Sequence, residues 1–518
     1  MMGPIDLDGL SLDSIRAGGL RDRPVTVLGL ARSGLALARF LADAGARVTI
    51  YDGRSAADLA DAIGALGDRP LTLALGPEVE PSLTWAGADL VATSPSITPD
   101  FPTTEPRLRS ALRALVDSRA GGDRSAPALV SEADLFLRLC PAPTIGVTGT
   151  KGKTTTASLI AAILAADPAH PVVLGGNIGI PIVERLFELT PDHRVVDELS
   201  ELQIPTLSRG TTVAVFTNVT ADHLDRHGSL DAYRAVKRRL AELVDRNGVL
   251  VLNADDPVVA SYADLGRART IVYRRDRPRP GGIGVVDGWI VADGVERLAV
   301  GGVGGIAVTG SEGRIMPVEE LVIPGAHNVS NALAAIAAGL LFGVDPEAIR
   351  AATSAFTGVE HRLEPVAVID GVSFINDSQG TQPDAVAAAL RAFGPPIVLI
   401  AGGRAKGIDL GALAPIVAER AYAAVLIGES GADLEAGFRS AGLVRTERAA
   451  DLETAVRRAD AIAREALAEA PAAVGPATVL LSPAAASFDM FTDYAARGRA
   501  FRAAVAALAA ARTEGVDG

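Results

Sequence analysis

Apolar residues recur along the chain in two spacings. Short, almost continuous apolar runs, such as Val25 to Leu30 and the segment PTIGV that ends at Val147, are typical of strands buried on both faces. Longer segments carry apolar residues three and four positions apart, as in TTTASLIAAILAA and LDAYRAVKRRLAELVD, and predict helices. Because such strands and helices alternate, the pattern predicts an α/β protein with parallel sheets.

The alternation falls into three stretches, which we expect to be domains over residues 1–130, 131–358 and 359–518. In the second stretch, GGIGVVDGWIVADG has two Asp-Gly turns between short β-rich runs, which predict a small antiparallel excursion. The third contains three buried strands, PIVLIAGG, AAVLIGES and ATVLLSPA, each ending in Gly or Ser. Ligands of such sheets bind at the carboxyl ends of the strands.

Composition narrows the class of protein. A chain of 518 residues suggests about three domains. The net charge of −13 argues against nucleic acid as a partner, because surfaces that follow phosphates are basic. Cys140 is the only cysteine, which excludes a disulfide framework within the chain. The N-terminus lacks the apolar core of a signal peptide, and NALAAIAAGLLFGV is too short to cross a bilayer. We therefore expect a cytoplasmic protein without membrane insertion.

The segment TGTKGKTTT, beginning at Thr148, has the features of a phosphate-binding loop. It follows a buried strand and opens a helix, so its backbone N–H groups and the positive helix end can surround phosphate oxygens. Lys153 can bind the outer phosphates and Thr154 can bind Mg²⁺. The usual pattern places a glycine five residues before Gly152, where this chain has Val147. A glycine-rich turn without a ligand is the alternative.

The first stretch opens with a strand, a glycine turn, a helix and a second strand that ends at Asp52, in outline a nucleotide-binding unit. Its glycines, Gly29 and Gly34, do not complete the G-x-G-x-x-G pattern, so a purely structural turn remains an alternative. Glu198 and His223 are candidate Mg²⁺ ligands near strand ends. Taken singly, His223 is typical of a loop histidine and Lys237 of a solvated helix lysine.

Nine segments occur in one order that resembles the Mur ligases, the ATP-dependent amide-forming enzymes of peptidoglycan precursor synthesis. They are TGTKGKTTT, GGNIGIP, ELSELQ, NVTADHLDRHG, YRAVK, PGAHNVSNALAA, FTGVEHRLE, INDSQGT and LSPAAASFDMF. The resemblance covers nearly the whole chain and explains the shifted glycine, since the loop of that family has the form T-G-T-x-G-K-T. It implies a Rossmann-like first domain, a central P-loop ATPase-type domain with a parallel sheet, and a Rossmann-like third domain.

Within the family, LGLARSG, FTGVEHR and SPAAASFD are most similar to the branch that adds D-glutamate to UDP-N-acetylmuramoyl-L-alanine through an acyl phosphate. The implied cofactors are ATP and Mg²⁺, and the implied form is a monomer. The resemblance implies that catalysis rests on Lys153, Glu198, His223 and Lys237, with Lys237 carbamylated. The implied metal ligands are Thr154, Glu198, His223 and carbamylated Lys237. The implied ATP contacts are Gly149, Thr150, Lys151, Gly152, Lys153, Thr154, Thr155, Asn328, Asn331, Arg362 and Asp377.

The resemblance also implies two substrate sites. The UDP-sugar site would consist of Leu30, Ala31, Arg32, Ser33, Gly34, Asp52, Arg54, Ser94 and Asn177. The carboxylates of glutamate would be bound by Thr381, Lys406, Ser487 and Tyr494. Lys406 would supply the main positive charge for that dianionic amino acid.

Three departures from the family pattern bear on the substrate. Gln379 stands where many D-glutamate ligases have lysine, Glu201-Leu202 replaces Ser-Phe, and Ser96 replaces a glycine of the uridine loop. The first two leave open a ligase for L-glutamate or another amino acid. Folylpolyglutamate synthesis is a further alternative, which the uridine loop disfavours. In a different class, an NAD-binding or nucleotide-sensing protein and a structural scaffold remain alternatives, although the missing middle glycine counts against NAD.

Overall fold

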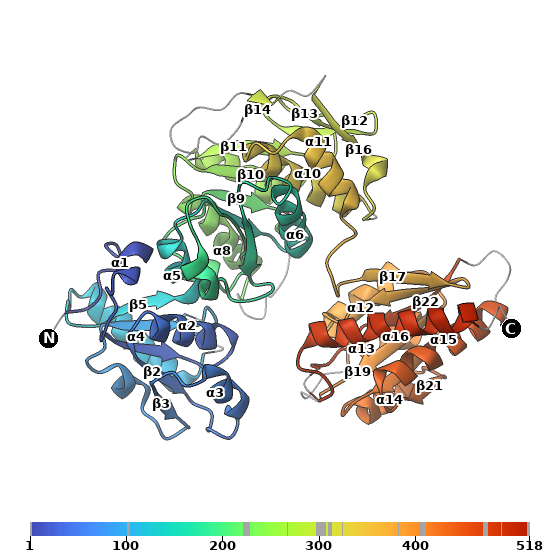
Figure 1. Ribbon diagram of the computed structural model, residues 1–518, viewed down its shortest axis with the longest axis horizontal. Helices are drawn as coiled ribbons and strands as arrows, with labels where there is room; N and C mark the ends of the chain where they lie inside the picture. The colour runs from blue at the N-terminus through green and yellow to red at the C-terminus, as the bar shows by residue number, and fades with distance from the viewer. Residues whose placement is uncertain are drawn as a thin grey trace. The chain divides into compact units, whose positions relative to one another are not determined.

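The computed structural model consists of two compact units, Met1–Phe356 and Thr357–Gly518. It describes residues 3–100, 104–220, 228–266, 268–296, 307–308, 313–323, 325–381, 383–404, 411–469, 475–487 and 489–514. The predicted α/β class with parallel-rich sheets is confirmed in both units (Figure 1). The domain divisions expected near residues 130 and 358 stay predictions. In the described part of the chain, none of the helices has the length and apolarity needed to cross a membrane.

The first sheet of unit 1 has five parallel strands in the order β3-β2-β1-β4-β5. The strands are β1 (Pro24–Leu28), β2 (Arg47–Asp52), β3 (Leu71–Leu75), β4 (Leu90–Thr93) and β5 (Ala128–Ser131). The helical segments of this region are α1 (Leu12–Arg16), α2 (Arg32–Asp43), α3 (Ala60–Leu66), η1 (Pro81–Trp85), α4 (Pro106–Ala120) and α5 (Glu132–Leu139). The strand order reverses beside β1, which is where ligands bind in open sheets of this kind.

The second sheet of unit 1 has nine strands in the order β16-β13-β12-β11-β10-β9-β6-β8-β7. They are β6 (Thr144–Thr148), β7 (Val172–Gly176), β8 (Arg194–Glu198), β9 (Val213–Phe216), β10 (Val249–Asn253), β11 (Arg269–Tyr273), β12 (Ile283–Val286), β13 (Trp289–Ala292) and β16 (Arg314–Pro317). The strands from β7 to β12 are parallel, and β12, β13 and β16 are antiparallel. The predicted antiparallel excursion is confirmed at β12–β13, where Asp287 and Gly288 have positive φ as a type I′ turn requires.

Helices cover this second sheet and connect its strands. They are α6 (Lys153–Leu164), α8 (Leu230–Leu243), α9 (Pro257–Ala260), α10 (Ala326–Leu341) and α11 (Pro346–Ala355), with the 3₁₀ turns η2 (Ile182–Glu188), η3 (Ile204–Thr206), η4 (Ser261–Leu265) and η6 (Val318–Glu320). Helices α6 and α10 pack against each other. The approach is close because Gly339 has no side chain: a Cβ there would lie 2.5 Å from Ile163 Cγ2. A separate two-stranded ribbon pairs β14 (Val295–Glu296) with β15 (Ala307–Val308).

The two sheets of unit 1 share a hydrophobic core. One cluster of buried apolar residues extends from Leu37 and Leu41 of α2 to Leu186 of η2, and the rings of Phe40 and Phe187 lie 5.0 Å apart. Helices α2 and α5 both contact η2. Loops of the first sheet are therefore packed against segments of the second, which matters for the sites below.

Unit 2 contains a six-stranded sheet in the order β17-β18-β22-β19-β20-β21. Its strands are β17 (Glu364–Ile369), β18 (Val372–Asn376), β19 (Ile397–Gly402), β20 (Ala423–Ile427), β21 (Thr446–Arg448) and β22 (Ala477–Leu481), and all are parallel except β17. Its helices are α12 (Pro383–Ala392), α13 (Leu413–Arg420), α14 (Gly431–Ser440), α15 (Leu452–Glu469) and α16 (Tyr494–Glu514). The three strands predicted as buried are β19, β20 and β22, and every residue of each is buried.

Candidate active site

The predicted phosphate loop joins β6 to α6 and depends on two glycines with positive φ. Gly149 has φ +150°, and a Cβ there would lie 2.0 Å from Thr217 Oγ1. Gly152 precedes the helix with φ +84° in the left-handed region, where side chains are disfavoured. Lys153 is the first helical residue, and its ammonium donates to the carbonyl oxygens of Gly149 and Thr150, each at 3.0 Å. The Lys153 ammonium therefore lies against the backbone of the loop.

The end of β9 holds this loop from the side. The backbone N–H groups of Thr150 and Lys151 donate to the carbonyl and side-chain oxygens of Asn218, at 2.7 and 2.9 Å. Thr217 Oγ1 donates to the Lys151 carbonyl oxygen at 2.6 Å. Sequence reasoning missed both Thr217 and Asn218 as loop contacts, although they directly follow β9 at the same edge of the sheet as the loop.

Lys237 lies on α8 and is fully buried, so the solvated lysine that a single-residue view suggests is wrong. Its ammonium donates at 3.1 Å to the Oγ1 of Thr148, the first residue of the phosphate loop. It also lies 5.6 Å from the ring centroid of Tyr233, whose hydroxyl is 3.1 Å from Thr150 Oγ1. Tyr233 was not predicted; its position four residues before Lys237 places both side chains on one helix face.

Glu198 ends β8 and reaches the same edge, because β8 pairs in parallel with β6. Its side chain is buried, and one oxygen, Oε1, accepts from Asn177 Nδ2 at 3.0 Å. The other oxygen, Oε2, is buried without a hydrogen-bond partner. Buried carboxylate oxygens are normally paired, so an unpaired one beside a phosphate loop fits a cation bound there. His223, the other predicted ligand, lies outside the described residues.

Further features test whether this edge suits Mg²⁺. Thr154 is buried in the first turn of α6, next to Lys153 and the half-buried Thr155. Among the residues that the structure describes, no three His, Cys, Asp or Glu side chains form a metal cluster. Mg²⁺ that is bound through phosphates needs only one or two protein carboxylates and keeps several waters. The hydroxyl of Thr154 and the carboxylate of Glu198 are therefore a sufficient set of protein ligands for a Mg²⁺ ion that is bound mainly through phosphates and water.

The two asparagines predicted on the adenine side lie on α10 against the start of α6. Asn331 Oδ1 accepts from Thr156 Oγ1 at 3.2 Å, and Asn331 Nδ2 donates to Asn328 Oδ1 at 3.0 Å. A Cβ on Gly152 would lie 2.5 Å from Asn331 Oδ1. The structure therefore brings both predicted asparagines to the phosphate loop.

A cavity of about 570 Å³ lies at the switch point of the first sheet. It is lined by Gly29, Tyr51, Asp52, Gly53, Arg54, Ser96, Ile97, Thr104, Glu105, Leu108 and Leu202. It contains the predicted Asp52 and Arg54 and two of the departures noted above, Ser96 and Leu202. A somewhat larger groove between η1 and α4, about 640 Å³, has no predicted site residue among its described lining.

Asp52 organises the loop beside this cavity. Its Oδ2 accepts from the Leu30 N–H at 2.8 Å, and Arg54 donates to both carboxylate oxygens. Burial alone would raise the pKa of Asp52, but the hydrogen bonds from Arg54 and Leu30 outweigh it and lower the pKa. The ionised carboxylate thus forms part of the cavity lining.

The other residues predicted for the UDP-sugar site lie close to this loop. Ala31 and Ser33 flank Arg32 at the start of α2. A Cβ on Gly34 would lie 1.8 Å from the Gly29 carbonyl oxygen, so the helix start packs directly on the glycine turn. Ser94 Oγ lies 3.1 Å from Ser96 Oγ in the loop after β4.

In unit 2, Asp377 follows β18 and is buried. Ser482 Oγ donates to its Oδ2 at 2.6 Å and the Leu363 N–H to its Oδ1 at 3.2 Å. Burial raises the pKa of Asp377 to about 6, although these hydrogen bonds act against the rise. Asp377, Arg362 and Gln379 line a cavity of about 220 Å³ beside α12. Arg362 and Asp377, the ATP contacts predicted in this unit, thus line the same small cavity as Gln379, which stands where many D-glutamate ligases have lysine.

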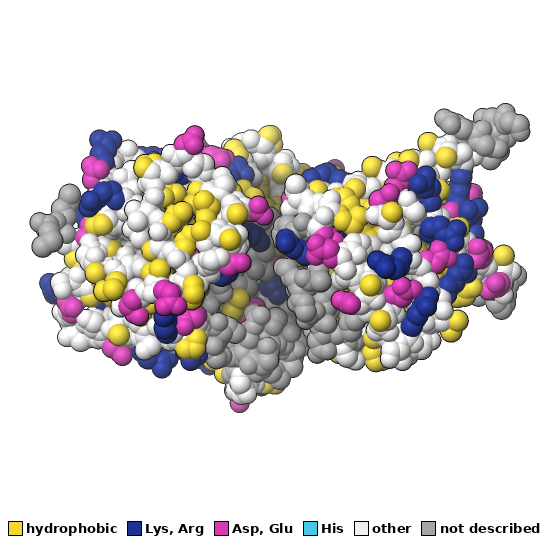
Figure 2. All heavy atoms as spheres, turned by 90° about the horizontal axis from the view of Figure 1, so that it is seen from below, with side chains coloured by type: hydrophobic (Ala, Val, Ile, Leu, Met, Phe, Trp, Pro, Cys, Tyr) yellow, Lys and Arg dark blue, Asp and Glu magenta, His cyan; other side chains and the backbone are white. Residues whose placement is uncertain are grey.

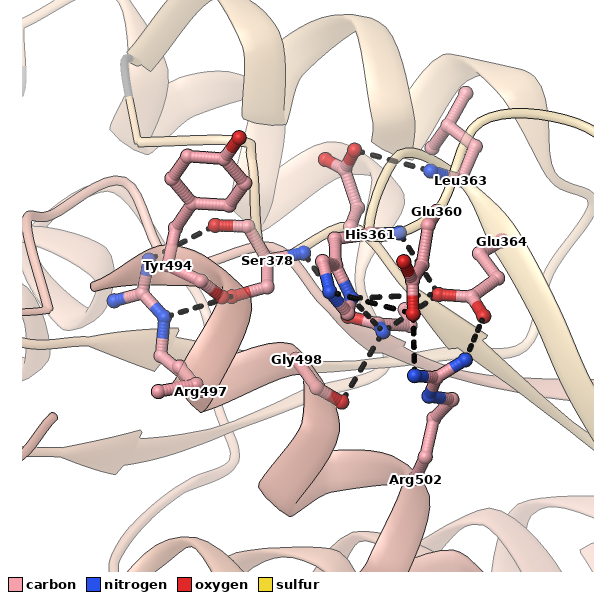
Figure 3. A network of polar contacts seen from close by, with 12 residues as sticks. Glu360, His361, Leu363, Glu364, Ser378, Tyr494, Arg497, Gly498 and Arg502 are labelled. Atoms are coloured by element: carbon pink, nitrogen blue, oxygen red, sulfur yellow. Dashed lines mark hydrogen bonds and ion pairs between the residues drawn. The ribbon is translucent and has the colours of Figure 1, made fainter. Parts of the chain in front are cut away.

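His361, next to Arg362, anchors a polar network (Figure 3). It is buried with φ +63°, and its Nδ1 lies 3.0 Å from Asn376 Nδ2. A Cβ on Gly498 would lie 2.2 Å from His361 Nδ1, so α16 approaches the histidine closely. Burial lowers the pKa of His361, although Glu360 and Glu364 act in the opposite direction.

Arg497 connects the segments that carry the residues predicted to bind glutamate. It is buried, and its guanidinium donates to Ser378 Oγ, to the Ser378 carbonyl and to the Ala485 carbonyl, at 3.0, 2.9 and 3.1 Å (Figure 3). Ser378 Oγ also donates to the Tyr494 carbonyl oxygen at 2.7 Å. Sequence reasoning missed Arg497; its spacing of three from Tyr494 on one helix was the available indication.

The remaining glutamate-site predictions lie around these segments. Thr381 donates its N–H to the Gln379 carbonyl oxygen at 2.8 Å, in a tight turn before α12. Ser487 is buried in the loop after β22, and its carbonyl oxygen accepts from the Phe491 N–H at 2.8 Å. Lys406 lies outside the described residues. On the faces drawn in Figure 2, basic side chains lie among acidic ones and form no single basic surface in the described part.

Comparison with known proteins agrees with this arrangement. Residues 147–339 match the model of the Mur ligase middle domain, and residues 361–484 match that of the Mur ligase glutamate ligase domain. A UDP-N-acetylmuramoylalanine–D-glutamate ligase of Symbiobacterium thermophilum is 39% identical over 493 residues, which is 95% of this chain and 100% of the relative. One with the same name from Pelotomaculum thermopropionicum is 36% identical, over 94% of this chain and 98% of the relative.

A solved structure agrees in fold. The crystal structure of a UDP-N-acetylmuramate–alanine ligase from Thermotoga maritima has a TM-score of 0.50 and 19% identity, covering 92% of this chain and 98% of that chain. At that identity the likeness concerns the fold alone. The near-full-length relatives are what establish membership: this chain belongs to the Mur ligase family.

Proposed function

We propose that this chain is an ATP-dependent ligase that joins D-glutamate to UDP-N-acetylmuramoyl-L-alanine during peptidoglycan precursor synthesis. One observation carries the proposal: the glycine loop with Lys153 lies beside Glu198, whose Oε2 is buried and unpaired. That edge suits a nucleotide with a divalent cation. The relatives that match almost the whole chain are named for the same substrates and support the choice of amino acid.

The first step would transfer the γ-phosphoryl group of ATP to the terminal carboxylate of the muramoyl substrate, forming an acyl phosphate and ADP. Negative charge spreads over phosphoryl oxygens during that step, so positioned cations and N–H donors lower its barrier. Lys153 and the N–H groups of residues 149–155 would act on those oxygens. Asn328 and Asn331 would contact the adenine side, while Arg362 and Asp377 would contribute contacts from unit 2. Mg²⁺, when bound by Thr154, Glu198 and His223, would neutralise phosphate charge.

The second step would be attack of the glutamate amine on the acyl phosphate, with phosphate leaving and an amide bond forming. The amine loses a proton as the bond forms. Both carboxylates of glutamate need donors, which Thr381, Lys406, Ser487 and Tyr494 would supply. The UDP moiety would lie in the cavity bounded by Asp52 and Arg54, next to the loop of residues 30–34 and Ser94.

Lys237 would act as a carbamate. Reaction of its neutral amine with CO₂ forms an N–C bond and releases a proton, which replaces a cation by an anion. A carboxylate so close to Thr148 would attract a metal ion that an ammonium repels. Complete burial of the side chain supports this assignment, since it shields a carbamate from water.

A product analysis tests the proposal. The purified enzyme is incubated with UDP-N-acetylmuramoyl-L-alanine, ATP, Mg²⁺ and either D- or L-glutamate, and product mass and phosphate release are followed. We expect one amide product, one ADP and one phosphate per turnover with D-glutamate, and no product with L-glutamate. Because Gln379 replaces a lysine, the reverse preference would identify an L-glutamate ligase. Absence of ADP formation with both enantiomers would overturn the proposed ligase reaction.

A further inference from the structure

The segment from Gly176 to Gly179, which begins at the last residue of β7, contacts both Arg32 of the first sheet and the carboxylate of Glu198. The Asn177 N–H donates to the Glu198 carbonyl oxygen at 2.8 Å, and Asn177 Nδ2 donates to Glu198 Oε1 at 3.0 Å. On its other side, Arg32 Nη2 donates to the carbonyl oxygens of Gly176, at 3.4 Å, and of Gly179. One short segment therefore links two sites that the proposed function assigns to different ligands.

Close packing leaves this segment little freedom to move independently of β8. Gly176 has φ +92°, and a Cβ there would lie 2.1 Å from Asp197 Oδ1 and 2.6 Å from the Glu198 carbonyl oxygen. Gly176 and Glu198 are also register partners in the parallel pairing of β7 with β8. A displacement of the segment would therefore displace the end of β8.

Asn177 determines which oxygen of Glu198 remains for a ligand. The carboxylate is 2% exposed, so solvent does not hold it. Oε1 is bound to the Asn177 amide, whereas Oε2 has no partner. Turning the carboxylate out of this orientation would break its hydrogen bond to the Asn177 amide, which is costly in a buried site.

Arg32 connects this arrangement to the first sheet. It begins α2, directly after the loop that starts at Leu30, and Gly34 packs that helix start on the glycine turn. The donors at Arg32 Nη2 are engaged by backbone carbonyls of the Gly176–Gly179 segment. A ligand that orders the Leu30 loop would thus also order the segment that holds Glu198.

We propose that Arg32 and Asn177 are positioning residues that couple occupancy of the UDP-sugar site to the orientation of the Glu198 carboxylate. The inference rests on the proposed function for the identity of the ligands. Coupling of this kind is reciprocal: each ligand raises the affinity of the other by the same factor. Because Arg32 is exposed at the surface, a factor of about 5 to 10 is expected, within the usual range for coupled sites.

Calorimetry of the full-length protein tests the coupling without turnover. Affinities for UDP and for UDP-N-acetylmuramoyl-L-alanine are measured with and without Mg²⁺ and a non-hydrolysable ATP analogue. We expect the wild-type protein to bind the muramoyl nucleotide about 5 to 10 times more tightly with the analogue present. Arg32→Met should reduce that ratio to about 1, whatever its own effect on the affinity for UDP, and Arg32→Lys should retain part of the ratio.

Two variants make the result specific. Arg39, on the same helix, donates to the Ala65 carbonyl at 3.0 Å and to Glu184 at 3.4 Å, so Arg39→Met removes another bridge but not the path to Glu198. It should keep the wild-type ratio. Asn177→Ala should reduce the affinity ratio for the muramoyl nucleotide to about 1. It should also raise the Mg²⁺ concentration needed for half-maximal phosphate release.

The outcomes separate this inference from the proposed function. If Arg32→Met weakens the binding of UDP and of the full substrate but keeps the wild-type ratio, Arg32 acts only as a ligand of the nucleotide and the positioning role is wrong. A wild-type protein that binds both ligands with a ratio of 1 would also exclude the coupling. A wild-type protein that binds no muramoyl nucleotide would instead count against the proposed function.

Discussion

Two strand–loop–helix turns of unit 1 are alike in outline and differ in their surroundings. The turn from β1 to α2 and the turn from β6 to α6 each follow a buried parallel strand, contain at least one glycine with positive φ and begin the helix with a basic residue, Arg32 or Lys153. In the first, Asp52 accepts the Leu30 N–H; in the second, loop N–H groups donate to neutral oxygens of Asn218.

That difference decides which ligand each turn suits. Beside the first turn, Asp52 is paired with Arg54, and a carboxylate in that position favours hydroxyl or amide groups of a ligand. In the second turn, the Lys153 ammonium lies against the loop backbone, close to hydroxyl groups and to the buried Glu198. This arrangement favours phosphates with a divalent cation. Local topology is therefore shared, and residues contributed by neighbouring strands make the chemistry different.

The largest expected effect distinguishes the two basic residues. Lys153→Ala should lower substrate-dependent phosphate release at least about 10³-fold, because it removes the cation acting on phosphoryl oxygens. The melting temperature should stay close to that of the wild-type protein, since the Lys153 ammonium donates to carbonyl oxygens of its own loop. The fold-loss in phosphate release caused by Arg32→Met should be less than a tenth of that caused by Lys153→Ala. Full activity in the Lys153 variant would remove the ATP assignment.

A second test concerns Lys237, the buried lysine of α8 that contacts the start of the β6 turn. Lys237→Ala should lower turnover about 10²-fold, a loss typical of removing a positioned charged group, and a short carboxylate such as acetate should restore part of it. Arg238→Ala is the matched control, because Arg238 is exposed on the same helix and pairs with Glu242 at 2.8 Å. Unimpaired turnover of the Lys237 variant would argue against a carbamate.

Glycine substitutions compare the packing of the two turns. In Gly34→Ala the new Cβ would meet the Gly29 backbone oxygen at 1.8 Å, and backbone cannot move aside cheaply. We expect a loss of about 2 to 3 kcal/mol in the free energy of unfolding. Gly152→Ala should cost about 1 to 2 kcal/mol, from its left-handed φ and a side-chain contact that can shift. Urea unfolding of both variants measures the order, and the reverse order would show that the β6 turn is the tighter one.

The smallest effect concerns Glu132, a buried carboxyl near Arg32. Burial raises the pKa of Glu132 from 4.5 to about 7, opposed by the Val183 N–H and by Arg32. Between pH 4.5 and 7 the folded state keeps a proton that the unfolded chain has released, so stability falls as pH rises through that window. Glu132 should contribute about 2 kcal/mol to this fall, so the fall should be smaller by about that amount in Glu132→Gln. Urea unfolding at pH 5 and pH 8 tests this, and an equal pH dependence in both proteins would contradict it.

Much of this protein follows from its sequence alone. Apolar periodicity located part of each of the three larger sheets, such as β1, β6 and β19, because burial on one or both faces imposes a local spacing. The Thr148–Thr156 loop was predicted from glycines and a Lys-Thr pair at a strand end, since positive φ and phosphate binding restrict residue type at fixed positions.

Only the tertiary structure decided which residues surround those loops. Tyr233, Asn218 and Arg497 carry no distinctive local pattern, yet they hold Thr150, the phosphate loop and the Ser378 segment. Lys237 resembled a surface lysine until the packing of α8 buried it against Thr148. Such contacts join residues dozens of positions apart, and their free energy depends on distance in space, which a local sequence pattern does not encode.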